Sequence, residues 1–184
     1  VPIPARAGDA MDGAAHPDLA EVWHWLSEVP DPEIPVISLT DLGIIRDVAW
    51  EGETLVVTVT PTYSGCPATA IINLDIETAL QSRGIERVRL ERQLSPPWTT
   101  DWLTEEGRQK LRDYGIAPPV DGTAADGRLA GRISRLAGSS NLTIACPRCG
   151  SARTEKVSQF GSTPCKASYR CQDCLEPFDY FKCI

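Results

Sequence analysis

Histidine is scarce in this chain, which has only two among its 184 residues. His16 and His24 lie on or just before the first expected helix, and neither has a serine or cysteine partner at a recognisable spacing. A nucleophilic triad built on histidine therefore has no support. The sequence also lacks a glycine-rich phosphate-binding loop.

Long hydrophobic runs are missing as well. No stretch approaches the roughly 20 consecutive apolar residues of a membrane span, and residues 1–5 lack the apolar core of a signal peptide. Seven cysteines are present, and four of them form Cys-x-x-Cys pairs, which suits metal binding in a reducing compartment better than a disulfide framework. We therefore expect a cytoplasmic protein with no membrane partner.

Basic side chains are outnumbered by acidic ones. The chain carries 18 lysines and arginines against 25 aspartates and glutamates, a net charge of −7. Residues 16–119 have a net charge of −9, whereas residues 146–184 have +2, which four thiolates around one Zn²⁺ would bring to zero. Neither part offers the basic surface that phosphate binding requires, so nucleic acid is not an expected partner.

Four segments are expected from composition and pattern. Residues 1–15 lack periodicity and predict a flexible N-terminal arm. Residues 16–119 carry the signals of one compact domain, and residues 120–141, rich in glycine, alanine and serine, predict a flexible linker. Residues 142–184 contain the paired cysteines and predict a zinc ribbon.

The hydrophobic pattern predicts alternating helices and strands. Helices are expected over residues 17–29, 68–83 and 105–114, and strands over residues 44–50, 54–60 and 86–92. Because the third strand follows a helix, it can pair in parallel with a strand of the preceding hairpin. The expected fold class is therefore α/β (α+β), a small sandwich of about three strands with helices, followed by a β-rich zinc ribbon.

Cys66 occupies the elbow between the second expected strand and the second expected helix. With Pro67 in the first helical turn, Cys66 is expected at or just before the helix N-cap, where the helix dipole would lower the pKa of its thiol. The plain alternative is a small buried cysteine that caps a core helix. Both interpretations stay open from the residues alone.

Asp31 and Glu33 flank Pro32 in a loop that two prolines must shape. In one interpretation, Asp31 caps the turn and Glu33 faces solvent. In the other, one of these carboxylates lies beside Cys66, where thiolate and carboxylate together make a transient site for iron.

The strongest chemical signal is the pair of motifs at residues 146–149 and 171–174. Each Cys-x-x-Cys turn directs two sulfurs to one point, so Cys146, Cys149, Cys171 and Cys174 are expected to bind one zinc ion tetrahedrally. Four cysteine ligands leave no open position for water, which makes the expected zinc structural. Redox-active dithiols are the alternative.

Two further cysteines and two tryptophans have no assigned partner. Cys165 and Cys183 are expected to be ordinary packing or surface cysteines, with an auxiliary thiol pair near the zinc as the alternative. Trp98 and Trp102 are expected to cover the core, with a partner surface as the alternative.

Several motifs in the sequence resemble known families. The chain resembles the MIP18-like family, which is linked to iron–sulfur assembly, at residues 31–35 (DPEIP), 39–45 (LTDLGII) and 63–67 (YSGCP). It is further similar to the PaaD-like proteins of phenylacetate degradation at residues 96–98 (PPW), 115–119 (GIAPP), 160–166 (FGSTPCK) and 176–183 (EPFDYFKC). The resemblance covers residues 18–119 and 142–184.

The resemblance implies an assembly role rather than catalysis. The epoxidase of that pathway has a di-iron oxygenase subunit and a reductase with flavin and an iron–sulfur cluster, so the implied partners are those subunits. The family's signature cysteine corresponds to Cys66 and its acidic loop residue to Glu33. The implied cofactors are structural zinc and, transiently, iron or an iron–sulfur cluster.

Three functional hypotheses follow. The first is a non-enzymatic maturation factor that delivers or positions iron. The second is a structural or regulatory adaptor subunit, and the third is a thiol enzyme with Cys66 as nucleophile. Since one cysteine cannot hold a cluster alone, ligands from a partner or from a homodimer are expected in the first case.

Overall fold

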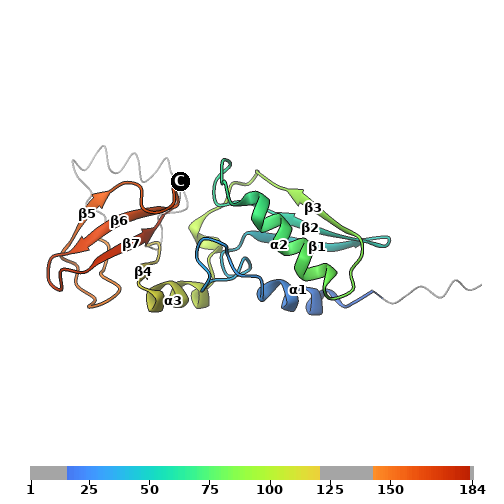
Figure 1. The fold of residues 1–184 in the computed structure, drawn as a ribbon, viewed down its shortest axis with the longest axis horizontal. Coiled ribbons are helices and arrows are strands. Elements are labelled where there is room, and N and C mark those ends of the chain that lie inside the picture. Colours follow the sequence, from blue (N-terminus) through green and yellow to red (C-terminus); the bar gives the residue numbers. More distant parts are fainter. Residues whose placement is uncertain (1–15, 121–142, 183–184) are drawn as a thin grey trace, which may run out of the picture.

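The computed structural model describes residues 16–120 and 143–182, which form two β-sheets with three α-helices (Figure 1). The expected arm at residues 1–15, the expected linker apart from residue 120, and Cys183 lie outside the described residues. Within the described residues, the expected fold class is confirmed: a three-stranded sheet with helices is followed by a β-rich C-terminal unit.

The first helix, α1 (Leu19–Ser27), lies within the range expected from its pattern. Asp18 caps it, because the Asp18 carboxylate accepts a hydrogen bond from the Ala20 N–H at 3.4 Å. The apolar side of the helix, with Val22 and Leu26, is buried in the core of the first domain.

The first sheet consists of β1 (Ile45–Glu51), β2 (Thr54–Val59) and β3 (Val88–Arg92), in that order. β1 and β2 form an antiparallel hairpin whose turn places Gly52 at a positive φ of 58°. The helix α2 (Thr69–Gln81) then returns the chain, so that β3 pairs in parallel with β2, as predicted. Figure 1 shows α2 lying along this sheet.

A helical connection follows the sheet and is tied to the loop after α1. It contains a short 3-10 turn (Thr100–Trp102) and α3 (Glu105–Tyr114). Asp41 accepts hydrogen bonds from the Thr104 hydroxyl at 2.9 Å and from the Lys110 ammonium group at 2.8 Å. These bonds hold the start of α3 against the loop that leads into the first strand.

Trp98 and Trp102 both pack on the first domain. Trp98 is buried, and its indole N–H donates to the Leu42 carbonyl at 2.8 Å. Trp102 is half-buried, with the Arg46 guanidinium 3.6 Å from its ring centre. Both positions agree with the expected covering role.

The second sheet has the order β4–β7–β6–β5, made of β4 (Ile116–Ala117), β7 (Pro177–Phe181), β6 (Lys166–Cys171) and β5 (Thr154–Ser158). β4 directly follows α3, yet it pairs in parallel with β7. A strand on the N-terminal side of the proposed boundary at residue 119 is therefore hydrogen-bonded into the sheet of the ribbon.

The junction between the two units is apolar. Phe181 is 1% exposed, and its ring meets Trp98 edge-on with 6.0 Å between the ring centres. Phe181 and Cys165 both belong to the core cluster of the first domain. The ribbon keeps a separate small core, made of Ala117, Ile144, Cys146, Ala167, Tyr169, Cys171, Phe178 and Tyr180.

Phe181→Ala should destabilise the protein by about 3–5 kcal/mol, since it leaves a cavity at the junction. Denaturant unfolding followed by tryptophan fluorescence would measure this change. The matched control is Phe160→Ala. Phe160 is 61% exposed, and its ring lies against the Lys182 ammonium group on the surface. This control should cost less than about 1 kcal/mol, and equal costs for the two variants would contradict the packing role of Phe181.

Candidate functional site

The four paired cysteines meet at one point. The Sγ atoms of Cys146, Cys149, Cys171 and Cys174 all lie within 4.8 Å of one another. The first turn is closed by a hydrogen bond from the Gly150 N–H to the Cys146 carbonyl at 2.8 Å. The second is closed by a hydrogen bond from the Cys171 N–H to the Glu176 carbonyl at 3.0 Å.

These sulfurs fit a tetrahedral zinc ion. Tetrahedral Zn–S bonds of about 2.3 Å place neighbouring sulfurs about 3.8 Å apart. The Cys146–Cys174 and Cys149–Cys171 sulfur pairs are 3.8 Å and 3.6 Å apart. The pKa shifts differ among the four thiols: the backbone N–H of Cys174 lowers the pKa of Cys171 to about 6, whereas hydrogen bonds with neighbouring cysteine sulfurs help to raise the pKa of Cys149 and Cys174. Metal binding would displace the protons that remain on the thiols. Four thiols fill a tetrahedral ion and leave no position for water, as in a structural site.

Cys66 lies close to its expected position but not at the cap. Helix α2 begins at Thr69 with Ala68 as its N-cap, so Cys66 and Pro67 both precede the helix. The Cys66 N–H donates to the Tyr63 carbonyl at 3.2 Å, and the Thr69 hydroxyl donates to the Cys66 carbonyl at 2.8 Å. These bonds form a tight turn that leaves the thiol half-buried.

The prediction of a lowered pKa at Cys66 is wrong. Burial raises the pKa of the thiol, and the negative charges of Glu33 and Asp31 raise it further. Hydrogen bonds from the Ala68 N–H and from Thr69 act in the opposite direction but do not outweigh these effects. At neutral pH the Cys66 side chain is therefore a thiol, not a thiolate.

Asp31 and Glu33 have different roles in their loop. Asp31 is buried, and its Oδ1 atom accepts the backbone N–H groups of Glu33 at 2.9 Å and Ile34 at 2.8 Å. Asp31 thus shapes the turn, as the plainer interpretation expects. The Glu33 carboxylate instead meets a thiol, because the Cys165 S–H donates to its Oε2 atom with 3.7 Å between sulfur and oxygen.

Cys165 packs in the core, as one interpretation expected, but sequence reasoning missed its position beside Glu33. It lies just before β6, is 5% exposed, and contacts the Thr163 hydroxyl at 3.0 Å in addition to Glu33. Burial, followed by Glu33 and Asp31, raises the pKa of its thiol to about 11. The available signal was a thiol in excess of the four zinc ligands within a short module, next to a proline in a loop.

The structure brings Asp31, Glu33, Cys66 and Cys165 to one small cavity at the junction. Its other walls are mostly apolar and include Ile34, Leu42, Ile44, Pro61, Ile72 and Phe181. The cavity measures about 10 Å³, which is space for about one water-sized particle. It is therefore too small for an organic substrate.

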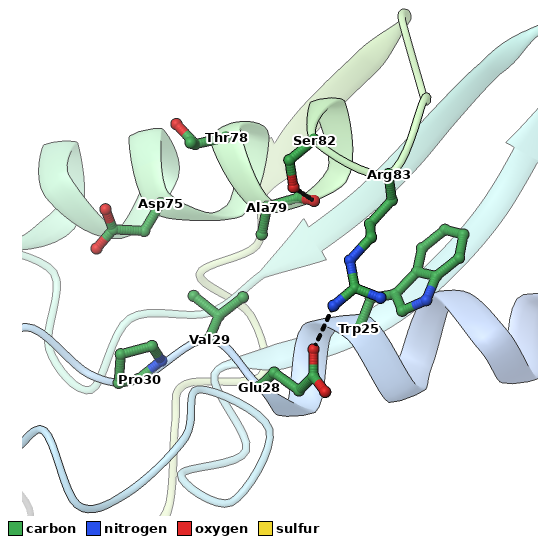
Figure 2. Close-up of a pocket in the computed structure, with 9 residues that line it drawn as sticks. All are labelled: Trp25, Glu28, Val29, Pro30, Asp75, Thr78, Ala79, Ser82 and Arg83. Atoms are coloured by element: carbon green, nitrogen blue, oxygen red, sulfur yellow. Dashed lines mark hydrogen bonds and ion pairs between the residues drawn. The ribbon is translucent and has the colours of Figure 1, made fainter.

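A second, larger cavity of about 390 Å³ lies between α1 and α2 (Figure 2). Arg83 crosses it, pairing with Glu28 at 2.6 Å and lying 5.6 Å from the centre of the Trp25 ring. Within the described part of the chain, the lining of this cavity contains no thiol or histidine.

None of the helices that the structure describes has the length and apolar character of a membrane span.

Two protein families match separate parts of the chain. The model of an iron-sulfur cluster assembly protein matches residues 19–89, and the model of the PaaD zinc beta ribbon domain matches residues 132–182. The first match covers α1 through the start of β3, and the second covers the cysteine cluster.

Similar proteins cover either most of the chain or its first domain. Over 170 residues the chain is 48% identical to a 1,2-phenylacetyl-CoA epoxidase subunit of Escherichia coli (strain K12), covering 92% of this chain and 96% of that protein. It is 34% identical over 93 residues to the Fe-S protein maturation auxiliary factor of Porphyromonas gingivalis (strain ATCC BAA-308 / W83), covering 50% and 88%. Among solved structures, the domain of unknown function DUF59 from Bacillus anthracis aligns at 26% identity with a TM-score of 0.47, covering 50% of this chain and 89% of that one.

The purified protein should contain one tightly held zinc ion per chain, and Cys171→Ala should lose it. Because the ribbon supplies Phe181 and Cys165 to the junction, loss of zinc should also raise amide hydrogen exchange around residues 165–181 and at Trp98. Elemental analysis and hydrogen-exchange mass spectrometry would measure both effects. Cys66→Ser is the control and should keep its zinc; protein that contains no zinc would refute this site.

The rate at which Cys66 reacts with iodoacetamide should rise only above the pH at which an ordinary cysteine ionises, since its pKa is raised. Glu33→Gln removes a negative charge, lowers the pKa of Cys66 and should speed its alkylation at neutral pH. Peptide mass spectrometry across a pH series would measure both profiles. The control Glu86→Gln changes an exposed carboxylate and should leave the pH profile of Cys66 alkylation unchanged. If the wild-type profile gives an apparent pKa equal to or below that of free cysteine, the raised pKa of Cys66 is contradicted.

Proposed function

This chain belongs to the PaaD family, and we propose that it is an accessory protein that matures an iron centre of a multicomponent phenylacetyl-CoA epoxidase. The names of its relatives support this role, since one is an epoxidase subunit and another an auxiliary factor of Fe-S protein maturation. The clients in this proposal are the oxygenase or reductase subunits of aerobic phenylacetate degradation. The proposed setting is the cytoplasm.

The observation that carries the proposal is the cavity that holds Cys66 beside Glu33. A thiol and a carboxylate facing one space are donors for iron and similar divalent ions. The cavity has room for about one water-sized particle and none for a substrate. In this proposal Cys66 is the functional thiol, Glu33 a supporting carboxylate, and Asp31 the residue that holds the loop in shape.

The arrangement supports an accessory role over a thiol enzyme. A cysteine nucleophile needs a lowered pKa or a neighbouring base, whereas the pKa of Cys66 is raised. Both histidines lie elsewhere: His16 stacks on Trp50 with 4.1 Å between the ring centres, and His24 lies 3.9 Å from Glu28. Neither histidine is therefore placed to act as a base for Cys66.

The adaptor hypothesis has one observation in its favour. Ile71 and Leu74 of α2 are 51% and 60% exposed, although both are large apolar side chains. Exposed apolar side chains on a helix that follows Cys66 suit contact with a client protein. A maturation factor must also dock on its client, so the two hypotheses differ in whether the thiol is needed after docking.

Cys66→Ser should leave the protein folded and zinc-loaded but abolish its ability to yield active, iron-loaded epoxidase in cells, because serine is a poor ligand for iron. Glu33→Ala should reduce the yield of active, iron-loaded epoxidase less severely, since the Cys66 thiol remains. The measurement is the iron content and activity of the epoxidase purified from cells that carry each variant.

The exposed variant Glu86→Gln serves as control and should support full maturation. Co-purification of each variant with the oxygenase and reductase subunits shows whether docking persists. Full maturation by Cys66→Ser would contradict the metal-delivery role and leave the adaptor hypothesis, in which docking alone is required.

A further inference from the structure

We propose that Cys66 and Cys165, one from each domain, form with Glu33 a second metal site that takes a single borderline divalent ion such as Fe²⁺. The identity of the ion as iron rests on the proposed function, whereas the ligand set rests on the structure. The site is separate from the zinc cluster, which uses four other cysteines.

The backbone of each domain fixes one of the two thiols. The turn before α2 positions Cys66, and it is held to the sheet because the Arg92 side chain donates to the Ser64 carbonyl. In the ribbon, the Lys182 N–H donates to the Cys165 carbonyl at 2.9 Å, which fixes Cys165 beside the last strand. The two thiols therefore reach the same cavity from independent, hydrogen-bonded segments.

Glu33 supplies the carboxylate between these segments. Its Oε2 atom is 3.7 Å from the Cys165 sulfur, and the side chain lines the cavity together with Cys66. Asp31 is a positioning residue here, because its Oδ1 atom already accepts two backbone N–H groups of the turn that carries Glu33. The buried cation near this group, Lys166, lies 3.6 Å from Asp179 and so has an acidic partner of its own.

The donor atoms and the size of the cavity determine which kind of metal ion the site can bind. Thiolate donors favour zinc and iron, while the carboxylate oxygen favours harder ions, so the mixture suits Fe²⁺, Co²⁺ or Zn²⁺. The cavity of about 10 Å³ has room for one ion and not for a multinuclear cluster. When the ion binds, each thiol loses its proton to solvent, so two protons are released per ion.

The second site differs from the zinc cluster in how far its ligands have converged. Among the described residues, the only group of three or more His, Cys, Asp or Glu side chains already placed to hold a metal ion is Cys146, Cys149, Cys171 and Cys174. Cys66, Cys165 and Glu33 must close further by side-chain rotation when an ion enters. This closure lowers the affinity, and three protein ligands leave a position for a client ligand, as transfer of an ion requires.

The test uses the full-length protein with its ribbon already loaded with zinc, titrated anaerobically with Co²⁺. Wild type should bind one additional Co²⁺ and show thiolate-to-cobalt charge-transfer absorption in the near ultraviolet. Cys66→Ser and Cys165→Ser should each lose about half of this absorption and weaken binding at least ten-fold. Glu33→Gln should weaken binding but retain the absorption of both thiolates.

Glu86→Gln is the matched carboxylate control and should bind Co²⁺ as wild type does. A second measurement needs no variant: calorimetry of wild type in buffers of different ionisation enthalpy should give two protons released per Co²⁺. Absence of an additional Co²⁺ in wild type, release of fewer than two protons, or an unchanged spectrum for folded Cys165→Ser would overturn the site.

The outcomes also separate this site from the proposed function. If Co²⁺ binds to both thiols while Cys66→Ser supports full epoxidase maturation in cells, the site stands and the maturation role fails. If no additional Co²⁺ binds while Cys66→Ser abolishes maturation, the role stands and the two-domain site fails.

Discussion

The contact between Phe181 and Trp98 is the interaction on which the arrangement of the molecule depends. Phe181 is the last residue of β7, and its burial against Trp98 fixes the ribbon to the first domain. Burying a phenylalanine side chain contributes about 1.5–3 kcal/mol. The same contact brings Cys165 beside Glu33, 132 positions apart in the sequence. This contact acts together with the pairing of β4 and β7, which also ties the ribbon to the segment that follows α3.

The cluster of four cysteines supports this junction from the opposite end of β6 and β7. Among the described residues, the ribbon has a core of only eight buried residues, and two of them, Cys146 and Cys171, are also members of the cluster. A core this small does not hold a fold by itself, so a bound metal would supply much of the folding free energy. Metal binding that orders the ribbon would therefore also fix the positions of Cys165 and Phe181 at the junction, because β6 and β7 connect the two places.

The electrostatics of the junction cavity make its thiols poor nucleophiles and, in the proposed metal site, suitable ligands. Burial and two nearby carboxylates keep both thiols protonated at neutral pH. A divalent cation would reverse this balance, because it offsets the carboxylate charge and stabilises each thiolate directly. The pocket is thus suited to cations and unreactive toward ordinary electrophiles, which matches an accessory role.

The sequence by itself determined the features that depend on neighbouring residues. The first helix, the hairpin around Gly52, the parallel return of β3 and the spacing of the paired cysteines all follow from local geometry and connection rules. The tertiary structure decided the rest. The pKa of Cys66 depends on burial and on Glu33, 33 positions earlier, and the pairing of β4 with β7 and the approach of Cys165 depend on docking of the ribbon. These effects arise from contacts between distant segments, and the local sequence pattern does not indicate which distant segments will come into contact.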